Sequence, residues 1–163
     1  MLLLMNTFKL VVLFSLVLVF SSCKKIPGIS NIDIVTHVNL LDQKGQSLFA
    51  PNGSVNRYNI TVHFVKNGKA VLFRQSNLDA ADGFLLKDKD TILSLFPNID
   101  IEETLPVTII KFGTYAADTI KCEVERTNGG NNKSIVKVWL NNVVQFDRKN
   151  KIGGVGRMLT IVK

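Results

Sequence analysis

Beyond residue 30, apolar and polar residues alternate in short segments along most of the chain. In the clearest segment, 57–65, every second residue is apolar: Tyr58, Ile60, Val62 and Phe64. Alternation with a period of two places apolar side chains on one face of a β-strand. The same pattern predicts further strands at 31–41, 70–74, 84–87, 91–96, 107–112, 119–126, 134–140, 143–146 and 158–162. No window shows the 3.6-residue apolar period of an amphipathic helix.

Turn residues separate the predicted strands. Asn67-Gly68 lies between two of them, and this dipeptide is a strong hairpin signal because both turn positions need a positive φ. Segments 128–132 and 141–142 are expected to close two further hairpins. Segment 107–112 has apolar residues on both faces and is predicted to be central. We therefore predict an all-β fold, an antiparallel β-sandwich of immunoglobulin-like or transthyretin-like type, with a small barrel as the alternative.

The first 23 residues follow a different pattern. Leu10–Phe20 is a continuous run of 11 apolar or small residues, and Lys9 is the only charged residue before Cys23. A helix that spans a bilayer needs about 20 apolar residues, so this run is too short and instead fits the core of a signal peptide. We expect three parts of the chain: a signal peptide at 1–22, a lipidated tether at 23–30 and a β-sandwich domain at 31–163.

Residues 20–23, Phe-Ser-Ser-Cys, resemble the cleavage box of bacterial lipoproteins. The resemblance implies that the Cys23 thiol receives a diacylglyceryl group and that cleavage leaves Cys23 as an acylated first residue. Two or more acyl chains anchor a protein stably, whereas one chain does so only marginally. Phe20 departs from the leucine usual at its position. The alternative is a secreted protein that is cleaved near Ser22.

The residues after Cys23 bear on the location of the protein. Lys24 and Lys25 stand where surface-exported lipoproteins of the Bacteroidetes often carry acidic residues, which favours the periplasmic face of the outer membrane. Further motifs are similar to those of a family of uncharacterised Bacteroidetes lipoproteins: Asp42–Leu48, Lys66–Lys69, Asn77–Asp79, Asp118–Ile120 and Trp139–Asn142. This resemblance implies the β-sandwich and the cell-envelope location only, because none of these motifs is catalytic.

Charge and cysteine content narrow the classes of partner. The chain of 163 residues has 20 Lys and Arg against 13 Asp and Glu, a net charge of +7, which suits a neighbour of anionic lipid or polyanionic glycan. It has no arginine-rich stripe that would indicate a nucleic-acid partner. Its 2 cysteines are too few for a disulfide-dense scaffold or a zinc site of four thiolates. Cys122 falls on the apolar phase of its strand and is expected to be buried.

Candidate metal ligands are sparse, and we expect no cofactor. His37 and His63 are the only histidines, and they fall short of the three or four ligands of a zinc site even if their strands are neighbours. Acidic and amide residues cluster around Gly83, but their spacing does not match a calcium-binding loop: Asn77, Asp79, Asp82, Asp88 and Asp90. Turn formation accounts for these residue types.

Sequence signals for catalysis are weak, and we expect no enzyme. The chain has no Gly-x-Ser-x-Gly, and the adjacent Glu102 and Glu103 would point to opposite faces of a strand, unlike the carboxyl pair of a glycosidase. A pairing of Cys122 with His63 requires an accessible thiol. Segment 153–156 is rich in glycine but lacks the Gly-Lys-Ser/Thr of a phosphate loop, so it is expected to be a turn.

Trp139 is the only tryptophan, and its strand has two possible orientations. If the residues beside it face the core, Trp139 lies on the outer face. A tight turn at 141–142 would then place Val144 opposite Trp139. Phe146 would lie opposite Lys137, and the four residues would form an apolar patch with a cation that could stack on a sugar ring or contact a partner protein. The opposite orientation buries Trp139, as in many immunoglobulin-like domains, and is the one we favour.

Thr91 and Thr119 are candidate modification sites. Each lies in an Asp-Thr-Ile sequence, which resembles the short acceptor for O-glycosylation in Bacteroidetes. Burial of either strand would prevent the modification, so each threonine can be an acceptor only if it is accessible to solvent.

The function expected from these features is that of a lipid-anchored, non-enzymatic cell-envelope protein. It would act as a binding or accessory module for a companion outer-membrane protein. A carbohydrate-binding module that uses the patch around Trp139 is the alternative from another class. A hydrolase is the third and least supported possibility.

Overall fold

The computed structural model of the protein describes residues 30–51, 53–86, 90–100, 103–154 and 156–163. The predicted signal peptide and Cys23 lie outside these residues. Asn31–Lys163 form one compact unit. Among the described residues, no helix is long and apolar enough to cross a membrane.

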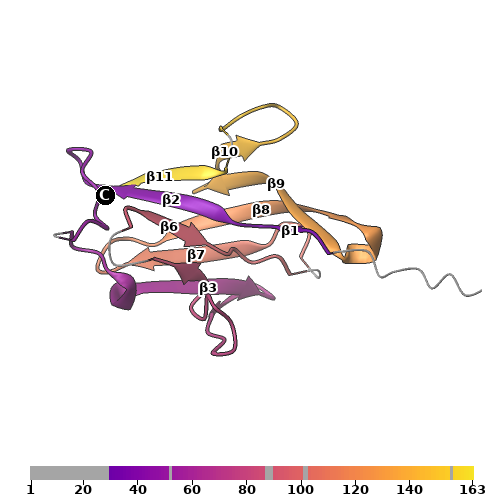
Figure 1. Cartoon of the computed structure of the whole chain (residues 1–163), viewed down its shortest axis with the longest axis horizontal. Helices are drawn as coiled ribbons and strands as arrows, with labels where there is room; N and C mark the ends of the chain where they lie inside the picture. Colours follow the sequence, from indigo (N-terminus) through magenta and orange to yellow (C-terminus); the bar gives the residue numbers. More distant parts are fainter. Residues whose placement is uncertain (1–29, 52, 87–89, 101–102, 155) are drawn as a thin grey trace, which may run out of the picture. The chain divides into compact units, whose positions relative to one another are not determined.

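Two β-sheets pack face to face, and the strands of both run roughly horizontally in the view of Figure 1. Sheet A has the strand order β1 (Ile32–Asp33), β9 (Asn132–Leu140), β8 (Asp118–Thr127), β7 (Val107–Phe112), β3 (Ile60–Lys66) and β4 (Lys69–Leu72), with β10 (Val143–Asp147) also paired to β9. Sheet B has the order β11 (Met158–Val162), β2 (Thr36–Leu41), β6 (Ile92–Leu95) and β5 (Phe84–Leu85). The helical turns of the described residues are η1 (Arg57–Asn59) and η2 (Asn128–Gly130). The predicted all-β sandwich is confirmed.

The sheets are mixed rather than purely antiparallel, because β1 pairs with β9 and β11 pairs with β2 in parallel. The segment predicted as one strand at 31–41 is divided where the chain passes from sheet A to sheet B. Arg157 holds this crossing. Its guanidinium donates hydrogen bonds to the Asp33 carboxylate, to the Val35 carbonyl at 2.8 Å and to the Ile135 carbonyl of β9 at 3.4 Å. One N-terminal segment thereby joins both sheets.

Local turn chemistry fixes two of the predicted hairpins. Asn67 and Gly68, with φ of 49° and 73°, link β3 to β4, while Asn141 and Asn142, with φ of 49° and 68°, link β9 to β10. Glycine and asparagine adopt this left-handed conformation at lower cost than other residues. β7 lies between β8 and β3, so its predicted central position is also confirmed.

A bulge in β9 breaks its alternation of inward and outward side chains. Ile135 and Lys137 lie opposite consecutive residues of β8, so Val136 is an extra residue between them. A β-bulge of this kind shifts the side-chain phase of one strand relative to its partner. Ile135 and Val138 are consequently both buried although they are three residues apart. Each of the two phases predicted for this strand therefore contributes to the core.

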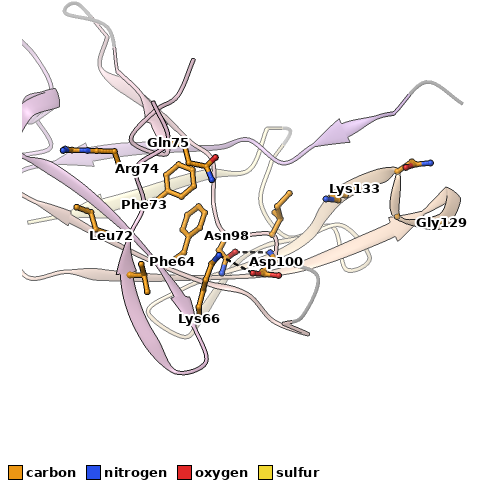
Figure 2. Close-up of a pocket in the computed structure, with 14 residues that line it drawn as sticks. Phe64, Lys66, Leu72, Phe73, Arg74, Gln75, Asn98, Asp100, Gly129 and Lys133 are labelled. Atoms are coloured by element: carbon orange, nitrogen blue, oxygen red, sulfur yellow. Dashed lines mark hydrogen bonds and ion pairs between the residues drawn. The ribbon is translucent and has the colours of Figure 1, made fainter. Parts of the chain in front are cut away.

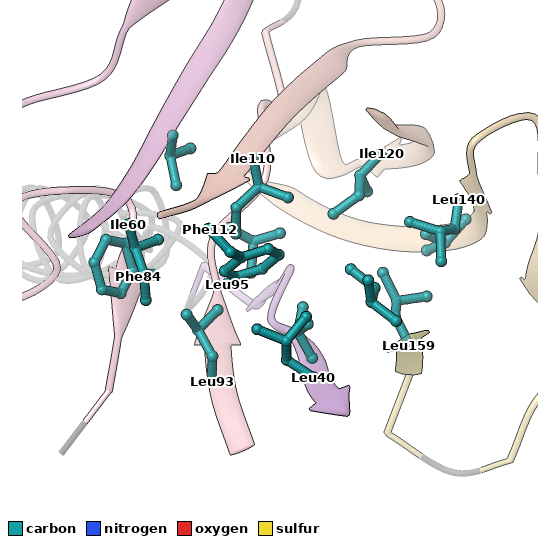
Figure 3. Close-up of a cluster of buried hydrophobic side chains, with 14 of the residues drawn as sticks. Leu40, Ile60, Phe84, Leu93, Leu95, Ile110, Phe112, Ile120, Leu140 and Leu159 are labelled. Atoms are coloured by element: carbon teal, nitrogen blue, oxygen red, sulfur yellow. The ribbon is translucent and has the colours of Figure 1, made fainter. Parts of the chain in front are cut away.

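Side chains from both sheets meet in one hydrophobic core (Figure 3). Its largest fully buried apolar members come from β2, β3, β6, β7, β8, β9 and β11: Leu40, Val38, Val62, Leu93, Leu95, Ile110, Phe112, Ile120, Ile135, Val138 and Leu159. Removal of apolar surface from water contributes roughly 25 cal/mol per Å², so this cluster supplies the main favourable term in folding.

Cys122 is buried on the inner face of β8, as predicted, and burial raises the pKa of its thiol to about 12. Only the thiolate is nucleophilic, so the native chain is expected to resist alkylation by iodoacetamide at about pH 8. Unfolding in urea should make Cys122 reactive, which mass spectrometry of the modified peptide would detect. A Ser76→Cys variant, in an exposed loop, is the accessible control. Rapid native alkylation of Cys122 would contradict the buried placement.

Candidate functional site

Trp139 lies on the outer face of sheet A, half-buried, between the buried residues Val138 and Leu140. The orientation that buries Trp139 is therefore wrong for this strand. The physical reason is the bulge at Val136, which lets Val138 and Leu140 face the core without moving Ile135 out of it. The tryptophan remains on the opposite side, where no described element of the chain covers the sheet.

Two rows of directly opposed residues lie on this side of sheet A, and Trp139 belongs to the first of them. We call the eight residues of the two rows the tryptophan face. The first row runs over β10, β9, β8 and β7: Val144, Trp139, Lys121 and Val107. The second runs over β8, β7, β3 and β4: Thr119, Ile109, His63 and Leu72. All eight side chains are half-buried or exposed. Directly opposed residues on one face of a sheet are in contact distance, so Val144 lies against Trp139, while Lys121 and His63 separate this pair and Leu72 from the β7 residues Val107 and Ile109.

Lys137, the cation of the predicted patch, lies beside the ring of Trp139. Its Nζ lies 5.0 Å from the centroid of the Trp139 ring and 2.9 Å from Oδ2 of Asp147. Hydrogen bonds from Lys137 and from the backbone N–H of Asn150 lower the pKa of the Asp147 carboxyl to about 2. Asp147 thus fixes the ammonium beside the indole ring, where a cation–π contact adds to the pairing.

Phe146 does not belong to this patch, which corrects the predicted register. Val144 is opposite Trp139 as expected, but the pairing shifts at Gln145, so that Phe146 lies opposite Val138 and Asp147 lies opposite Lys137. The ring of Phe146 is directed to the inner side, where it packs against the core. A single extra residue in β10 exchanges an aromatic side chain for a carboxylate beside the cation.

Because the pKa of Asp147 is low, we expect the free energy of unfolding to depend on pH in the acid range. A carboxyl whose folded pKa of about 2 lies below its unfolded value of about 3.9 stabilises the fold above pH 4 and loses that effect as the pH falls toward 2. Asp147→Asn is therefore expected to lower the free energy of unfolding at neutral pH. The difference from the native chain should shrink between about pH 4 and pH 2.

Urea titrations at a series of pH values measure this effect. Asp79→Asn, at an exposed loop position, is the matched control and should follow the native chain. An Asp147→Asn difference that stays constant from neutral pH to pH 2 would show that Asp147 and Lys137 are not coupled.

Sequence reasoning missed the β7 and β4 members of the tryptophan face. A signal for them was present, since segment 107–112 has apolar residues on both phases. In a two-layer sandwich the outer face of a strand is normally polar, so Val107 and Ile109 indicated an apolar outer surface as well as a central position. Leu72 gave the same signal, because residues 70–73 are a continuous apolar run with apolar side chains on both phases of the strand.

A second candidate site is an open cavity of about 590 Å³ beside the β3–β4 hairpin (Figure 2). The rings of Phe64 and Phe73 face each other in it, with 4.3 Å between their centroids. Polar and charged side chains surround the rings. Among them, Lys66 is ion-paired with Asp100, and the Asn98 side chain accepts a hydrogen bond from the Asp100 N–H. No sequence signal pointed to this cavity, because its walls come from segments that are far apart in the chain.

The candidate metal ligands do not converge. His37 is on β2 of sheet B and His63 on β3 of sheet A, so their strands are not neighbours and the two side chains lie on opposite outer faces. Asp82 is ion-paired with Arg74 at 3.2 Å, while Asp88 lies outside the described residues. In the part of the chain that the structure describes, no group of three or more His, Cys, Asp or Glu could hold a metal ion.

The remaining candidates have clear placements. Thr91 is exposed just before β6, whereas Thr119 is half-buried within β8 and its N–H donates to Oδ1 of Asn141. Thr91 is thus the more accessible acceptor. Gly153 forms part of the predicted turn, with φ of 73° and its Cα packed on β10 so closely that a Cβ would lie 2.3 Å from the Gln145 carbonyl oxygen. Glu102 lies outside the described residues.

Comparison of the chain with known protein families, with curated proteins and with solved structures finds no match. The tryptophan face and the cavity are therefore the features that bear on the function of the protein.

Proposed function

We propose that this chain is a lipid-anchored, non-enzymatic cell-envelope protein whose β-sandwich binds another envelope protein through the tryptophan face. The observation that carries the proposal is the outer face of sheet A. There a half-buried tryptophan, two β7 side chains and the exposed Leu72 lie among the polar residues Lys121, His63 and Thr119 on the side away from the core. Exposed apolar side chains around an aromatic residue, with polar residues beside them, are typical of protein contact sites.

The charged residues support a binding role over a catalytic one. The most buried ion pairs each hold parts of the fold together. Arg157 joins β1 to β9, and Lys163 pairs with Asp118 at 2.7 Å. Lys137 pairs with Asp147 between β9 and β10. These charged groups have structural partners, and the apolar side chains of the tryptophan face take no part in these ion pairs.

Crosslinking in whole cells tests the proposed function. A tagged chain is crosslinked, the membrane fraction is purified and bound proteins are identified by mass spectrometry. One dominant partner is expected from the native chain, with loss of that partner in Trp139→Ser and a strong reduction in Cys23→Ala. Val162→Ser is the matched control, because Val162 is an exposed apolar strand residue on the outer face of sheet B.

The pattern of losses separates the parts of the proposal. Loss in Cys23→Ala alone would support the anchor and contradict contact through the tryptophan face. Equal recovery of the partner from the native chain and from Trp139→Ser, Cys23→Ala and Val162→Ser would contradict both the anchor and contact through the tryptophan face. Membrane association of Cys23→Ala that equals that of the native chain would refute the lipid anchor.

A carbohydrate-binding module is the second candidate, favoured by the outward position of the single tryptophan beside Lys121. An aromatic ring on a sheet surface can stack on a sugar. Against it stands the ammonium of Lys137, which Asp147 holds 5.0 Å from the ring centroid and which occupies part of the ring surface. A glycan array decides the matter: a glycan that binds the native chain but not Trp139→Ser would favour this candidate over a protein partner.

A further inference from the structure

The inner face of sheet A is open at the tip of the β3–β4 hairpin. Along β3 the inward side chains of Ile60 and Val62 are buried, but Phe64 is only half-buried, and its partner on β4, Val71, is 50% exposed. These residues share one face of the sheet, so burial declines toward the hairpin turn. Sheet B, with fewer and shorter strands, does not cover this end, and the cavity of about 590 Å³ lies there.

The floor of the cavity is aromatic and apolar. The rings of Phe64 and Phe73 are tilted by 33° at a centroid distance of 4.3 Å, and Val71 and Ile99 extend the apolar surface beside them. Aromatic rings pack favourably against another flat apolar group, either stacked or edge to face. In Figure 2 both rings lie beside Asn98, with Leu72 and Arg74 on one side of them and Asp100 and Lys133 on the other.

One wall of the cavity is fixed in place by hydrogen bonds. The Asn98 amide nitrogen donates to the Val65 carbonyl at 3.2 Å, and its oxygen accepts from the Asp100 N–H at 3.0 Å. The Arg126 guanidinium donates to the carbonyls of Ile99 and Asp100 at 3.1 and 2.8 Å. Because these hydrogen bonds already hold the wall in one conformation, a ligand that enters has little to reorder, which favours binding.

The rim of the cavity is positively charged. Among the described lining residues, Lys66, Arg74 and Lys133 provide the cations and Asp100 the only carboxylate. Lys66 lies 3.8 Å from Asp100, at the limit of an ion pair, and both it and Arg74 are largely exposed. Lys133 forms no ion pair with a described residue. Because Arg74 is ion-paired with Asp82 at 3.2 Å, Lys133 is the cation of the rim that is placed to face an anion.

We propose that this cavity binds a small amphipathic anion, with a flat apolar body against Phe64 and Phe73 and an anionic group beside Lys133. Its volume lies within the range of about 300–1,000 Å³ that small-molecule sites occupy, and an apolar floor with a few charged groups is their usual composition. Carboxylates, phosphates and lipid headgroups share this anionic chemistry. The site lies mainly on the inner side of sheet A, and Leu72 is the one described lining residue that it shares with the tryptophan face.

The probe is 8-anilinonaphthalene-1-sulfonate, a flat apolar anion that becomes fluorescent in apolar surroundings. The full chain is studied in nanodiscs of zwitterionic phosphatidylcholine, and the signal of empty discs is subtracted. Saturable binding is expected, and Lys133→Glu should weaken it by roughly tenfold or more, because a charge-assisted contact contributes about 1.5–3 kcal/mol and 1.4 kcal/mol is tenfold. Lys121→Glu, the same change on the tryptophan face, should bind the probe as the native chain does.

The uncharged analogue N-phenyl-1-naphthylamine separates charge from apolarity, because it lacks the sulfonate. It should bind the native chain and Lys133→Glu equally. Competition by benzoate, phenyl phosphate or dihexanoyl phosphatidic acid then identifies which source of the anion the site prefers. Far-UV circular dichroism confirms that each variant is folded.

Three results would overturn the proposal. They are no saturable signal above that of empty discs, equal binding of the sulfonate by Lys133→Glu and the native chain, and equal weakening by Lys121→Glu, which would indicate attraction by net charge alone.

Discussion

Phe112→Ala is expected to lower the free energy of unfolding by about 3–5 kcal/mol, the range for removal of a buried phenyl ring. Phe112 is 0% exposed at the end of β7, and its ring meets the ring of Phe49 edge to face at a centroid distance of 5.8 Å. Phe49 belongs to the long connection between β2 and η1. The substitution therefore leaves a cavity and also removes the contact that holds this connection on the core.

Urea titration followed by circular dichroism measures the change. Val143→Ala is the control, because Val143 is an apolar strand residue that is 60% exposed, and its loss should stay within about 0.5 kcal/mol. A loss below about 1 kcal/mol for Phe112→Ala would mean that the ring is not in a packed core.

Arg157→Ala is expected to be the second most damaging change, with a loss of about 3 kcal/mol. The side chain of Arg157 is almost buried, and its removal takes a donor from the carbonyls of Val35 and Ile135 and from the carboxylate of Asp33. Asp33 keeps the hydroxyl of Ser134, and the Ile135 carbonyl keeps the guanidinium of Arg148. The loss is smaller than for a fully buried ion pair, because Asp33 is half-exposed and can be hydrated.

Two further variants give this prediction its specificity. Arg157→Lys should recover little of the lost free energy, because an ammonium cannot donate to three acceptors in the planar arrangement of a guanidinium. Arg57→Ala, at an exposed position of η1, should change the free energy of unfolding by less than about 0.5 kcal/mol. Equal losses for Arg157→Ala and Arg57→Ala would show that Arg157 does not hold the sheet crossing.

Local patterns predicted the strands, the hairpins and the inward position of Cys122, because each depends on a few adjacent residues. Asn67-Gly68 is an example, since the turn type and the pairing register follow from two residues. The bulges at Val136 and Gln145 could not be predicted in this way. An extra residue in a strand has no local marker when its side chain is compatible with either face, and it was these two bulges that placed Trp139 outside and Phe146 inside.

The parallel pairs and the cavity are properties of tertiary structure. β1 is two residues long, and its pairing with β9 depends on the Asp33–Arg157 contact between residues 124 positions apart. The cavity exists because sheet B does not extend to the β3–β4 hairpin, which no periodicity along the chain can indicate. The tryptophan face was partly predictable, through the apolar residues of β7.

The division of the N-terminal segment between two sheets has a mechanical consequence. Tension that reaches the domain along the chain from before Ser30 acts first on β1 and then on the Asp33–Arg157 contact, before it reaches any residue of the hydrophobic core. Hydrogen bonds from Arg157 lower the pKa of Asp33, so protonation of this carboxyl at low pH weakens the contact. Because Asp33 is half-exposed, salt also screens it. The force needed to detach the leading strand should therefore depend on pH and ionic strength, whereas the force needed to open the core should depend on side-chain packing.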